Sequence, residues 1–161
     1  MEGRSFDEAQ RRSEAYFHKD HSMTIRSSVA LALTLAAQAA YADPHDVFGI
    51  FVTQEGDSHI EIADCGDGSP CGTVVWIDPD SLEDGVRPED LKTKSTGEAV
   101  LGLTMLSDFE RAKKDWRGGK IYSPKVDKTY SSRLKRLDDN TLEVKGCIGF
   151  FCQTQIWMPK P

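Results

Sequence analysis

The sequence predicts an all-β domain, either a small antiparallel up-and-down β-barrel or a β-sandwich, with about eight strands. Two observations lead to this prediction. Short segments rich in β-branched and aromatic residues are separated by turns that contain Gly, Pro, Asp or Asn. Helical periodicity is weak over the same region. The expected strands cover residues 47–53, 59–65, 72–78, 118–124, 128–137, 141–147 and 152–158.

The first three strands have clear patterns. Residues 47–53 (VFGIFVT) are rich in β-formers and precede a turn signal at residues 54–57. In the next strand Ile60 and Ile62 alternate with polar or small neighbours, as expected for a half-buried strand. Residues 72–78 (GTVVWID) are dense in β-branched and aromatic side chains, which favours a third strand.

The middle of the domain is less regular. Residues 79–98 are polar and rich in Asp, Gly and Pro, which predicts a long loop with one helical turn near residues 88–91. Residues 99–116 fit one strand followed by a second, more polar strand, but a helix over residues 107–116 also fits. Both interpretations stay open at this point. The strands expected after residue 117 are connected by short turns and are therefore predicted as hairpins.

Residues 23–42 have the pattern of a secretory signal peptide. Arg26 supplies the positive charge, residues 29–40 form a mostly apolar run, and Ala40-Tyr41-Ala42 is an A-x-A cleavage site. A membrane anchor is the alternative, but the apolar run is shorter than the ~20 residues that a span needs. We therefore expect cleavage after Ala42, a periplasmic or secreted protein, and no transmembrane segment in the mature chain.

Residues 1–22 precede this signal and are polar and highly charged. We interpret them as an N-terminal extension upstream of the true start at Met23, with a short cytoplasmic helix as the alternative. The expected barrel domain is residues 43–161. It carries the full net charge of −6, because residues 1–42 contain five acidic and five basic residues. This acidic balance argues against nucleic-acid binding, which needs a basic surface.

The cysteines indicate disulfides. An even number in an exported chain favours this chemistry, and four cysteines allow three connectivities. The turn-rich segment CGDGSPC and the short segment CIGFFC each favour a local pair that closes a hairpin end, so we predict Cys65–Cys71 and Cys147–Cys152. The alternatives are a zinc site, whose ligand spacing fits poorly, and a redox pair, for which the C-x-x-C motif is absent.

Several strings together resemble a known family. They are Gly49-Ile50-Phe51, Trp116-Arg117-Gly118-Gly119-Lys120-Ile121-Tyr122-Ser123-Pro124 and Gly146-Cys147-Ile148-Gly149-Phe150-Phe151-Cys152. Over nearly all of residues 43–161 the chain resembles the bacterial exported family called domain of unknown function 2147. The resemblance implies a lipocalin-like (calycin) β-barrel without an established activity, and it supplies no catalytic residues. In that superfamily the first strand usually carries G-x-W, whereas Phe51 stands here in place of the tryptophan.

The sequence shows no motif for catalysis or metal binding. His59 shares a strand face with Glu61, and we interpret it as a surface histidine because no nucleophile motif accompanies it. The acidic stretch 78–85 fails the EF-hand pattern, since Leu82 and Glu83 stand where an oxygen ligand and a glycine are required. We therefore expect no enzymatic activity, no cofactor and no metal; a looser calcium site in this stretch is the alternative to a solvated loop.

The aromatic residues indicate the expected function. A small barrel encloses either its own side chains or one small apolar ligand. We expect a carrier of a small, partly apolar molecule, with the 79–98 loop as a lid. The alternatives are aromatic residues that only fill the core, and an envelope protein–protein interaction module with a filled barrel and no ligand. Trp76 is expected on the same strand face as Val74. The candidate ligand-binding residues are Trp76, Trp116, Tyr122 and Tyr130.

Overall fold

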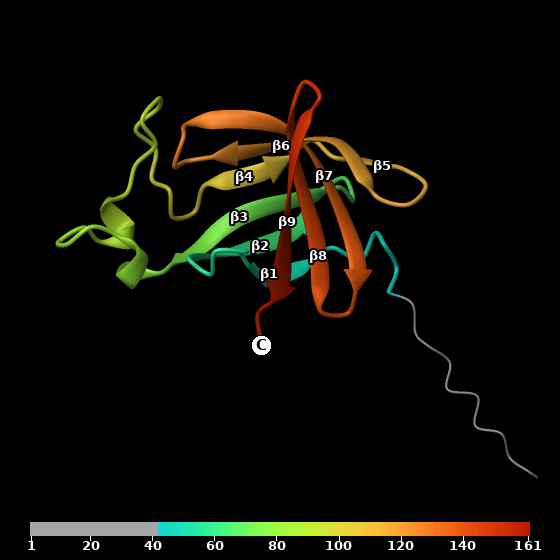
Figure 1. The fold of residues 1–161 in the computed structure, drawn as a ribbon, viewed down its shortest axis with the longest axis horizontal. Helices are drawn as coiled ribbons and strands as arrows, with labels where there is room; N and C mark the ends of the chain where they lie inside the picture. The colour runs from blue at the N-terminus through green and yellow to red at the C-terminus, as the bar shows by residue number, and fades with distance from the viewer. Residues whose placement is uncertain (1–41) are drawn as a thin grey trace, which may run out of the picture. The chain divides into compact units, whose positions relative to one another are not determined.

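The computed structural model describes residues 42–161. The predicted N-terminal extension and the predicted signal peptide, apart from Ala42, lie outside the described residues. The described chain forms one antiparallel β-sheet that closes into a barrel (Figure 1). The predicted all-β barrel is therefore confirmed, and the sandwich alternative is wrong.

Consecutive strands pair with one another around most of the barrel. The order in space is β4-β3-β2-β1-β9-β8-β7-β6, and an additional pairing between β4 and β6 closes the ring. The two-residue β5 pairs with β6 beside β4. The bounds are β1 (Gly49–Val52), β2 (Ser58–Asp64), β3 (Pro70–Ile77), β4 (Thr104–Ser107), β5 (Glu110–Arg111), β6 (Trp116–Ser123), β7 (Lys128–Asp138), β8 (Thr141–Ile148) and β9 (Phe151–Pro159).

Residues 107–116 contain short strands, so the helix considered for this segment is wrong. Ser107 ends β4, and Asp108 follows with a φ of 62°, a left-handed conformation that interrupts a helix. The next residue, Phe109, is 4% exposed and packs inside the barrel. Burial of Leu106 and Phe109 against other strands therefore decided a segment whose local pattern was ambiguous.

One end of the barrel is closed by the segment that precedes β1. Trp116, at the start of β6, is 4% exposed, and its Nε1 donates a hydrogen bond of 3.0 Å to the His45 carbonyl oxygen. The His45 Nε2 donates to the Ala112 carbonyl oxygen at 2.7 Å. The Arg111 guanidinium lies 5.6 Å from the centroid of the Trp116 ring. The polar atoms of this end are thus bonded within the protein, and we call it the closed end.

Glycines permit close packing inside the barrel. A Cβ atom at Gly119 would overlap the ring of Phe109, and one at Gly72 would lie 2.6 Å from Leu106 Cδ1. Non-bonded carbon atoms repel each other at distances below 3.0 Å, so a side chain at either position would force Phe109 or Leu106 to move out of the close-packed interior. The Gly-Gly pair of the WRGGKIYSP string is therefore explained at its second position by the packing of Phe109.

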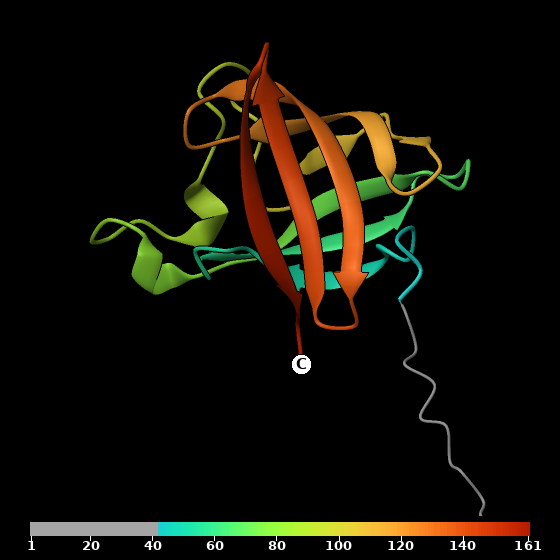
Figure 2. The same cartoon turned by 45° about the vertical axis from the view of Figure 1, so that its right-hand side comes forward.

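A long connection between β3 and β4, residues 78–103, lies on the side of the barrel away from the N-terminal residues 43–48 (Figures 1 and 2). It contains two short 3-10 segments, η2 (Pro79–Ser81) and η3 (Pro88–Asp90), and η3 confirms the predicted helical turn. After η3, an isolated antiparallel β-bridge between Lys92 and Ala99 brings two parts of this connection together. Within residues 42–161, no helix has the length and apolar character to span a membrane.

Candidate functional site

A cavity of about 820 Å³ lies between the barrel and the 78–103 loop. Its apolar lining consists of Val74, Ile77, Leu82, Val86, Leu91, Val100, Met105, Ile121, Pro124, Val126, Val144 and Trp157. Its polar lining consists of Thr53, Glu55, Asp57, Ser58, Ser81, Glu83, Lys92, Lys94, Tyr122, Ser123, Lys125, Tyr130, Gln153 and Gln155, and Gly146 contributes backbone.

The barrel wall supplies the deep part of the cavity. Val74, Val144 and Trp157 are at most 3% exposed and belong to the buried core. The Trp157 Nε1 donates a hydrogen bond of 2.8 Å to Gln155 Oε1, so this indole needs no partner inside the cavity. On β8, nearer the β8–β9 hairpin, Gly146 lines the cavity without a side chain, and a Cβ built there would be in ordinary van der Waals contact with Ile121 Cγ2 at 3.4 Å. The deep part is therefore apolar.

The 78–103 loop supplies the opposite wall. Leu82 and Leu91 are half-buried and pack against the core, although they stand in a polar stretch of sequence. Backbone hydrogen bonds hold both: the Leu82 N–H donates to Pro79 O at 3.2 Å, and the Val100 N–H donates to Leu91 O at 3.0 Å. The loop thus forms an apolar cover whose inner side chains are held by local turns.

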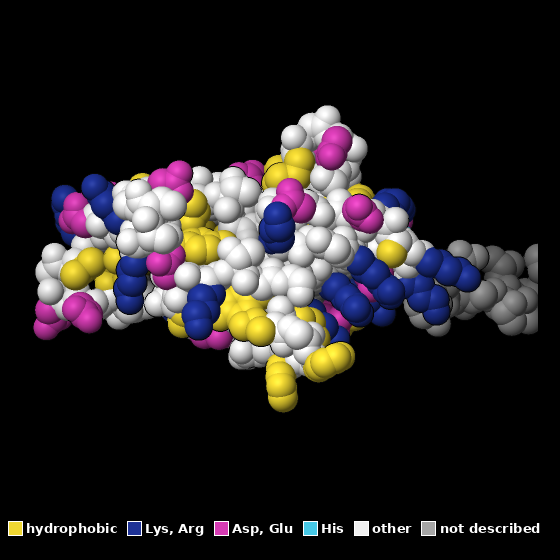
Figure 3. All heavy atoms as spheres, turned by 90° about the horizontal axis from the view of Figure 1, so that it is seen from above, with side chains coloured by type: hydrophobic (Ala, Val, Ile, Leu, Met, Phe, Trp, Pro, Cys, Tyr) yellow, Lys and Arg dark blue, Asp and Glu magenta, His cyan; other side chains and the backbone are white. Residues whose placement is uncertain are grey.

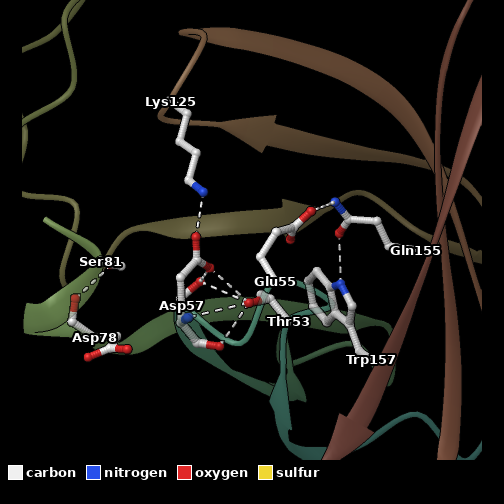
Figure 4. Close-up of polar contacts among 9 residues, drawn as sticks. Thr53, Glu55, Asp57, Asp78, Ser81, Lys125, Gln155 and Trp157 are labelled. Carbon is white, nitrogen blue, oxygen red and sulfur yellow. Dashed lines mark hydrogen bonds and ion pairs between the residues drawn. The ribbon is translucent and has the colours of Figure 1, made fainter.

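Asp57 organises one side of the cavity mouth (Figure 4). Its Oδ1 accepts hydrogen bonds of 3.0 Å from the hydroxyls of Thr53 and Ser58, and its Oδ2 forms an ion pair with Lys125. Partial burial by itself would raise the pKa of Asp57, but the bonds from Lys125, Thr53 and Ser58 outweigh it and lower this pKa below its usual value. The ionised carboxylate therefore joins the β1–β2 turn to the β6–β7 turn.

A second polar cluster ties the loop to the β6–β7 turn. Asp127 accepts hydrogen bonds from the Tyr122 hydroxyl at 2.5 Å and from Ser95 Oγ at 2.8 Å. These bonds lower the pKa of Asp127, and the bond to Asp127 is the main reason why the pKa of Tyr122 is raised. Asp127 has a φ of 53°, which aspartate tolerates in tight turns. The two turns flanking the mouth are thus each held by an ionised aspartate.

The mouth also carries cationic groups that are not held in ion pairs. Among residues 42–161, Lys125 is paired with Asp57, whereas Lys92 and Lys94 have no acidic partner within ion-pair distance. Both lysines are exposed and line the cavity from the loop. Glu55 and Glu83, which form no ion pair within residues 42–161, line the same cavity, so a polar or charged end of a molecule would meet groups of both signs there.

The structure places two of the four predicted ligand-binding residues at the cavity. Tyr122 and Tyr130 are half-buried and line it from β6 and β7. They are not direct cross-strand partners, because Tyr122 pairs with Thr129 and Tyr130 with Ile121. Their role in binding stays a prediction.

The two predicted tryptophans lie elsewhere. The expectation that Trp76 shares a strand face with Val74 is wrong, because pairing between β2 and β3 shifts by one residue: Ile60 pairs with Val74, but His59 pairs with Trp76. This bulge turns Trp76 outward, where it is 37% exposed and stacks on His59 with ring centroids 4.2 Å apart. Trp116 is in the closed end and does not line the cavity.

Sequence reasoning missed most of the apolar lining. The loop residues Leu82, Val86 and Leu91 are spaced through a polar segment without helical or strand periodicity, so the segment was predicted as a long polar loop and a lid, but its apolar residues were not predicted to line the site. Their one signal was the presence of isolated large apolar residues in an otherwise acidic stretch. Trp157, the large aromatic residue at the bottom of the cavity, was recognised as part of a strand but was not selected.

The predicted disulfides are confirmed. Cys65 and Cys71 bridge the β2–β3 connection with Cα atoms 5.2 Å apart, and Cys147 and Cys152 bridge the β8–β9 hairpin with Cα atoms 4.0 Å apart. All four cysteines are therefore used, and neither the zinc alternative nor a free thiol applies. Each bridge staples the end of a hairpin.

The closed eight-strand antiparallel barrel has a lipocalin-like fold. A search of solved structures supports this class: the chain is similar to protein HP1028 from Helicobacter pylori, described as belonging to the lipocalin family, with 23% identity, a TM-score of 0.58, and coverage of 73% of this chain and 84% of that chain. The likeness shows the shared fold. Residues 49–158 match a family of uncharacterized proteins conserved in bacteria (DUF2147), and the chain belongs to that family. No curated protein matches the chain.

Proposed function

We propose that this barrel is a carrier that binds one small molecule with an apolar body and a polar end. The observation that carries the proposal is the cavity of about 820 Å³, which is within the range of small-molecule sites. The apolar body would lie against Trp157 and the valines of the barrel wall, under the leucines of the loop. The polar end would lie at the mouth, beside Lys92 and Lys94.

The cavity supports this proposal over its alternative. An interaction module with a filled barrel needs no internal space, whereas the space here is large enough for a ligand of drug-like size. The way in which the 78–103 loop is held supports the same proposal. Ser95 of the loop bonds to Asp127, and backbone hydrogen bonds connect the loop to the barrel, so the loop is held in place without filling the cavity.

A pair of matched variants tests the carrier proposal. Gln153 and Thr154 are adjacent exposed residues of β9, but only Gln153 lines the cavity. We expect Gln153→Phe to obstruct the mouth and weaken binding at least about tenfold, and Thr154→Phe to leave binding unchanged. The measurement is isothermal titration calorimetry with dodecanoate, dodecanol and dodecylamine.

Two outcomes would contradict the proposal. In the first, none of the three ligands gives a heat of binding in calorimetry, and native mass spectrometry of the gently purified protein shows the mass of the polypeptide without a bound ligand. The other is equal binding by the two phenylalanine variants, which would place the ligand outside the cavity. The comparison of dodecanoate with dodecylamine shows whether the polar end of the ligand meets Lys92 and Lys94 or the carboxylates Glu55 and Glu83, which line the same cavity.

We also propose that the protein acts outside the cytoplasm and releases its ligand chemically unchanged. The two disulfides support an oxidising compartment, where such bonds persist. The signal-like pattern of residues 23–42 supports the same location. Intact-mass analysis of protein from the envelope fraction tests it: an N-terminus at Asp43 is expected, and a cytoplasmic protein with Met1 or Met23 would contradict it.

A further inference from the structure

The tip of the β8–β9 hairpin exposes large apolar side chains to solvent. Phe150 is 102% exposed, Phe151 is 87% exposed and Ile148 is 56% exposed. We call these three residues the apolar tip. Figures 1 and 2 show that the hairpin end stands clear of the barrel. Most exposed apolar residues of a protein occur singly, and a group of this kind marks a surface that meets another partner.

The apolar tip is held rigidly. Ile148 pairs with Phe151, and the Cys147–Cys152 disulfide links the next pair of residues. The two residues of the turn are Gly149 and Phe150, and Gly149 has the positive φ of 56° that the first position of a type II′ hairpin turn uses. A flexible tip could fold its aromatic rings back onto the barrel, but this stapled hairpin keeps them in solvent.

Cationic side chains lie further back along the hairpin on the outer face of the sheet, whereas Ile148 and Phe151 lie on its inner face. Arg133 pairs with Lys145 across β7 and β8, and Lys135 pairs with Glu143 two residue pairs further from the tip. Lys145 is three residues from Ile148, which is about 10 Å along a strand. Seen from above, hydrophobic side chains stand out from one edge of the molecule, with Lys and Arg side chains beside them (Figure 3).

We propose that the apolar tip docks on the surface of a bilayer that contains anionic lipids. The rings would enter the boundary between headgroups and acyl chains, where peripheral proteins bury apolar groups to a depth of ~5–10 Å. At that depth Arg133 and Lys145 would reach the phosphates, because they lie ~10 Å behind the tip. The attraction is local, since the chain as a whole has a net charge of −6.

The shape of the tip favours a bilayer over a protein partner. Three side chains on a narrow convex turn offer far less area than the ~800 Å² per partner of a standard protein interface. A bilayer needs no complementary hollow, since acyl chains rearrange around an inserted ring. On the barrel side of the hairpin, Gly146 and Gln153 form the pair next to Cys147 and Cys152 and line the cavity, so a docked tip brings this part of the cavity wall near the lipid surface. The docking itself does not depend on the cavity being a carrier site.

Vesicle flotation with the full chain tests the proposal. Vesicles of phosphatidylcholine mixed with phosphatidylglycerol are compared with vesicles of phosphatidylcholine alone. Replacement of Phe150 or Phe151 by Ser should lower the partition coefficient about tenfold for each ring. Replacement of Arg133 and Lys145 by Gln should lower binding to the mixed vesicles roughly tenfold and leave binding to the neutral vesicles unchanged.

Met158→Ser is the matched control, because Met158 is an exposed apolar residue, 59% accessible, at the other end of β9. Residues 29–40 are apolar and present in every variant, so only differences between variants count. Near-ultraviolet circular dichroism should show the same fold for all of them.

Equal vesicle binding by the tip variants and the Met158→Ser control would overturn the proposal, as would no binding by the wild-type chain. A concentration-dependent dimer that the Phe150→Ser and Phe151→Ser changes abolish, without vesicle binding, would instead identify a second copy of the chain as the occupant.

Discussion

The two ends of this barrel use aromatic residues and polar groups in different ways. At the closed end, Trp116 is buried under residues 43–48, and its indole donates to the His45 carbonyl oxygen. At the cavity end, Trp157 is equally buried, but its indole is satisfied by the neighbouring Gln155, and open space lies beyond it. Trp116 thus ties two elements together at the closed end, whereas Trp157 bonds within its own strand and lines the cavity.

The largest expected loss of stability comes from Trp116→Ala, which removes the buried tryptophan of the closed end. Removing a ring that is 4% exposed should lower the free energy of unfolding by about 3–5 kcal/mol, since it leaves a cavity and removes one of the two hydrogen bonds that the His45 carbonyl oxygen accepts. Trp76→Ala is the matched control and should cost about 1 kcal/mol or less, because Trp76 contacts His59 on the outer surface. Urea unfolding measures both, and equal losses would contradict the assignment of Trp116 to a closing role.

A glycine-to-alanine pair compares packing at the two ends directly. Gly119→Ala places a Cβ against the Phe109 ring, so we expect a loss of about 1–3 kcal/mol in the free energy of unfolding. Gly146→Ala places the same atom beside the cavity, 3.4 Å from its nearest neighbour, and should change stability by less than about 1 kcal/mol. Thermal unfolding of the two variants checks the difference. A larger loss at Gly146 would mean that the cavity end is the more tightly packed one.

The smallest effect concerns the ionised cluster at the mouth. Because the pKa of Asp57 is lowered in the folded protein, its carboxylate contributes stability above pH 3.8, its ordinary pKa, and this contribution is lost as the pH falls through the lower folded value. Asp57→Asn should therefore lower the free energy of unfolding by about 1 kcal/mol at neutral pH. The difference from wild type should shrink in acid.

Asp139→Asn is a suitable control for that measurement, because this exposed residue uses only its backbone carbonyl in a hydrogen bond. Denaturant unfolding at neutral pH and at pH values below 3.8 provides the comparison. A difference between wild type and Asp57→Asn that grows in acid would contradict a lowered pKa.

The fold was predictable from the sequence because its signals are local. Alternation in residues 59–65 and 141–147, turn residues between the segments, and short cysteine loops each define a strand or a hairpin without reference to the rest of the chain. The disulfides followed for the same reason, since each joins residues on one hairpin. Half of the predicted lining residues, Tyr122 and Tyr130, lie at the cavity because they flank a turn that the sequence marks clearly.

The other two predicted lining residues, Trp76 and Trp116, do not line the cavity. For Trp76, the prediction assumed a strand without a bulge. A single bulge between β2 and β3 moved Trp76 to the outer face, since one extra residue reverses the side on which every later side chain points. Trp116 was placed by contacts with residues about seventy positions earlier in the chain, which no local pattern encodes. The same applies to Phe109, whose burial resolved the ambiguity of residues 107–116.

The sequence by itself determined the class of fold, the hairpins, the cysteine pairs and the resemblance to a bacterial family, because these depend on periodicity and on neighbours a few residues apart. Tertiary structure alone decided which end of the barrel is closed, that the acidic loop turns Leu82 and Leu91 inward, and that a cavity of about 820 Å³ stays open beneath it. The physical reason is that burial depends on contacts between segments that are far apart in the chain. The free energy of these contacts produces no periodic pattern in the local sequence.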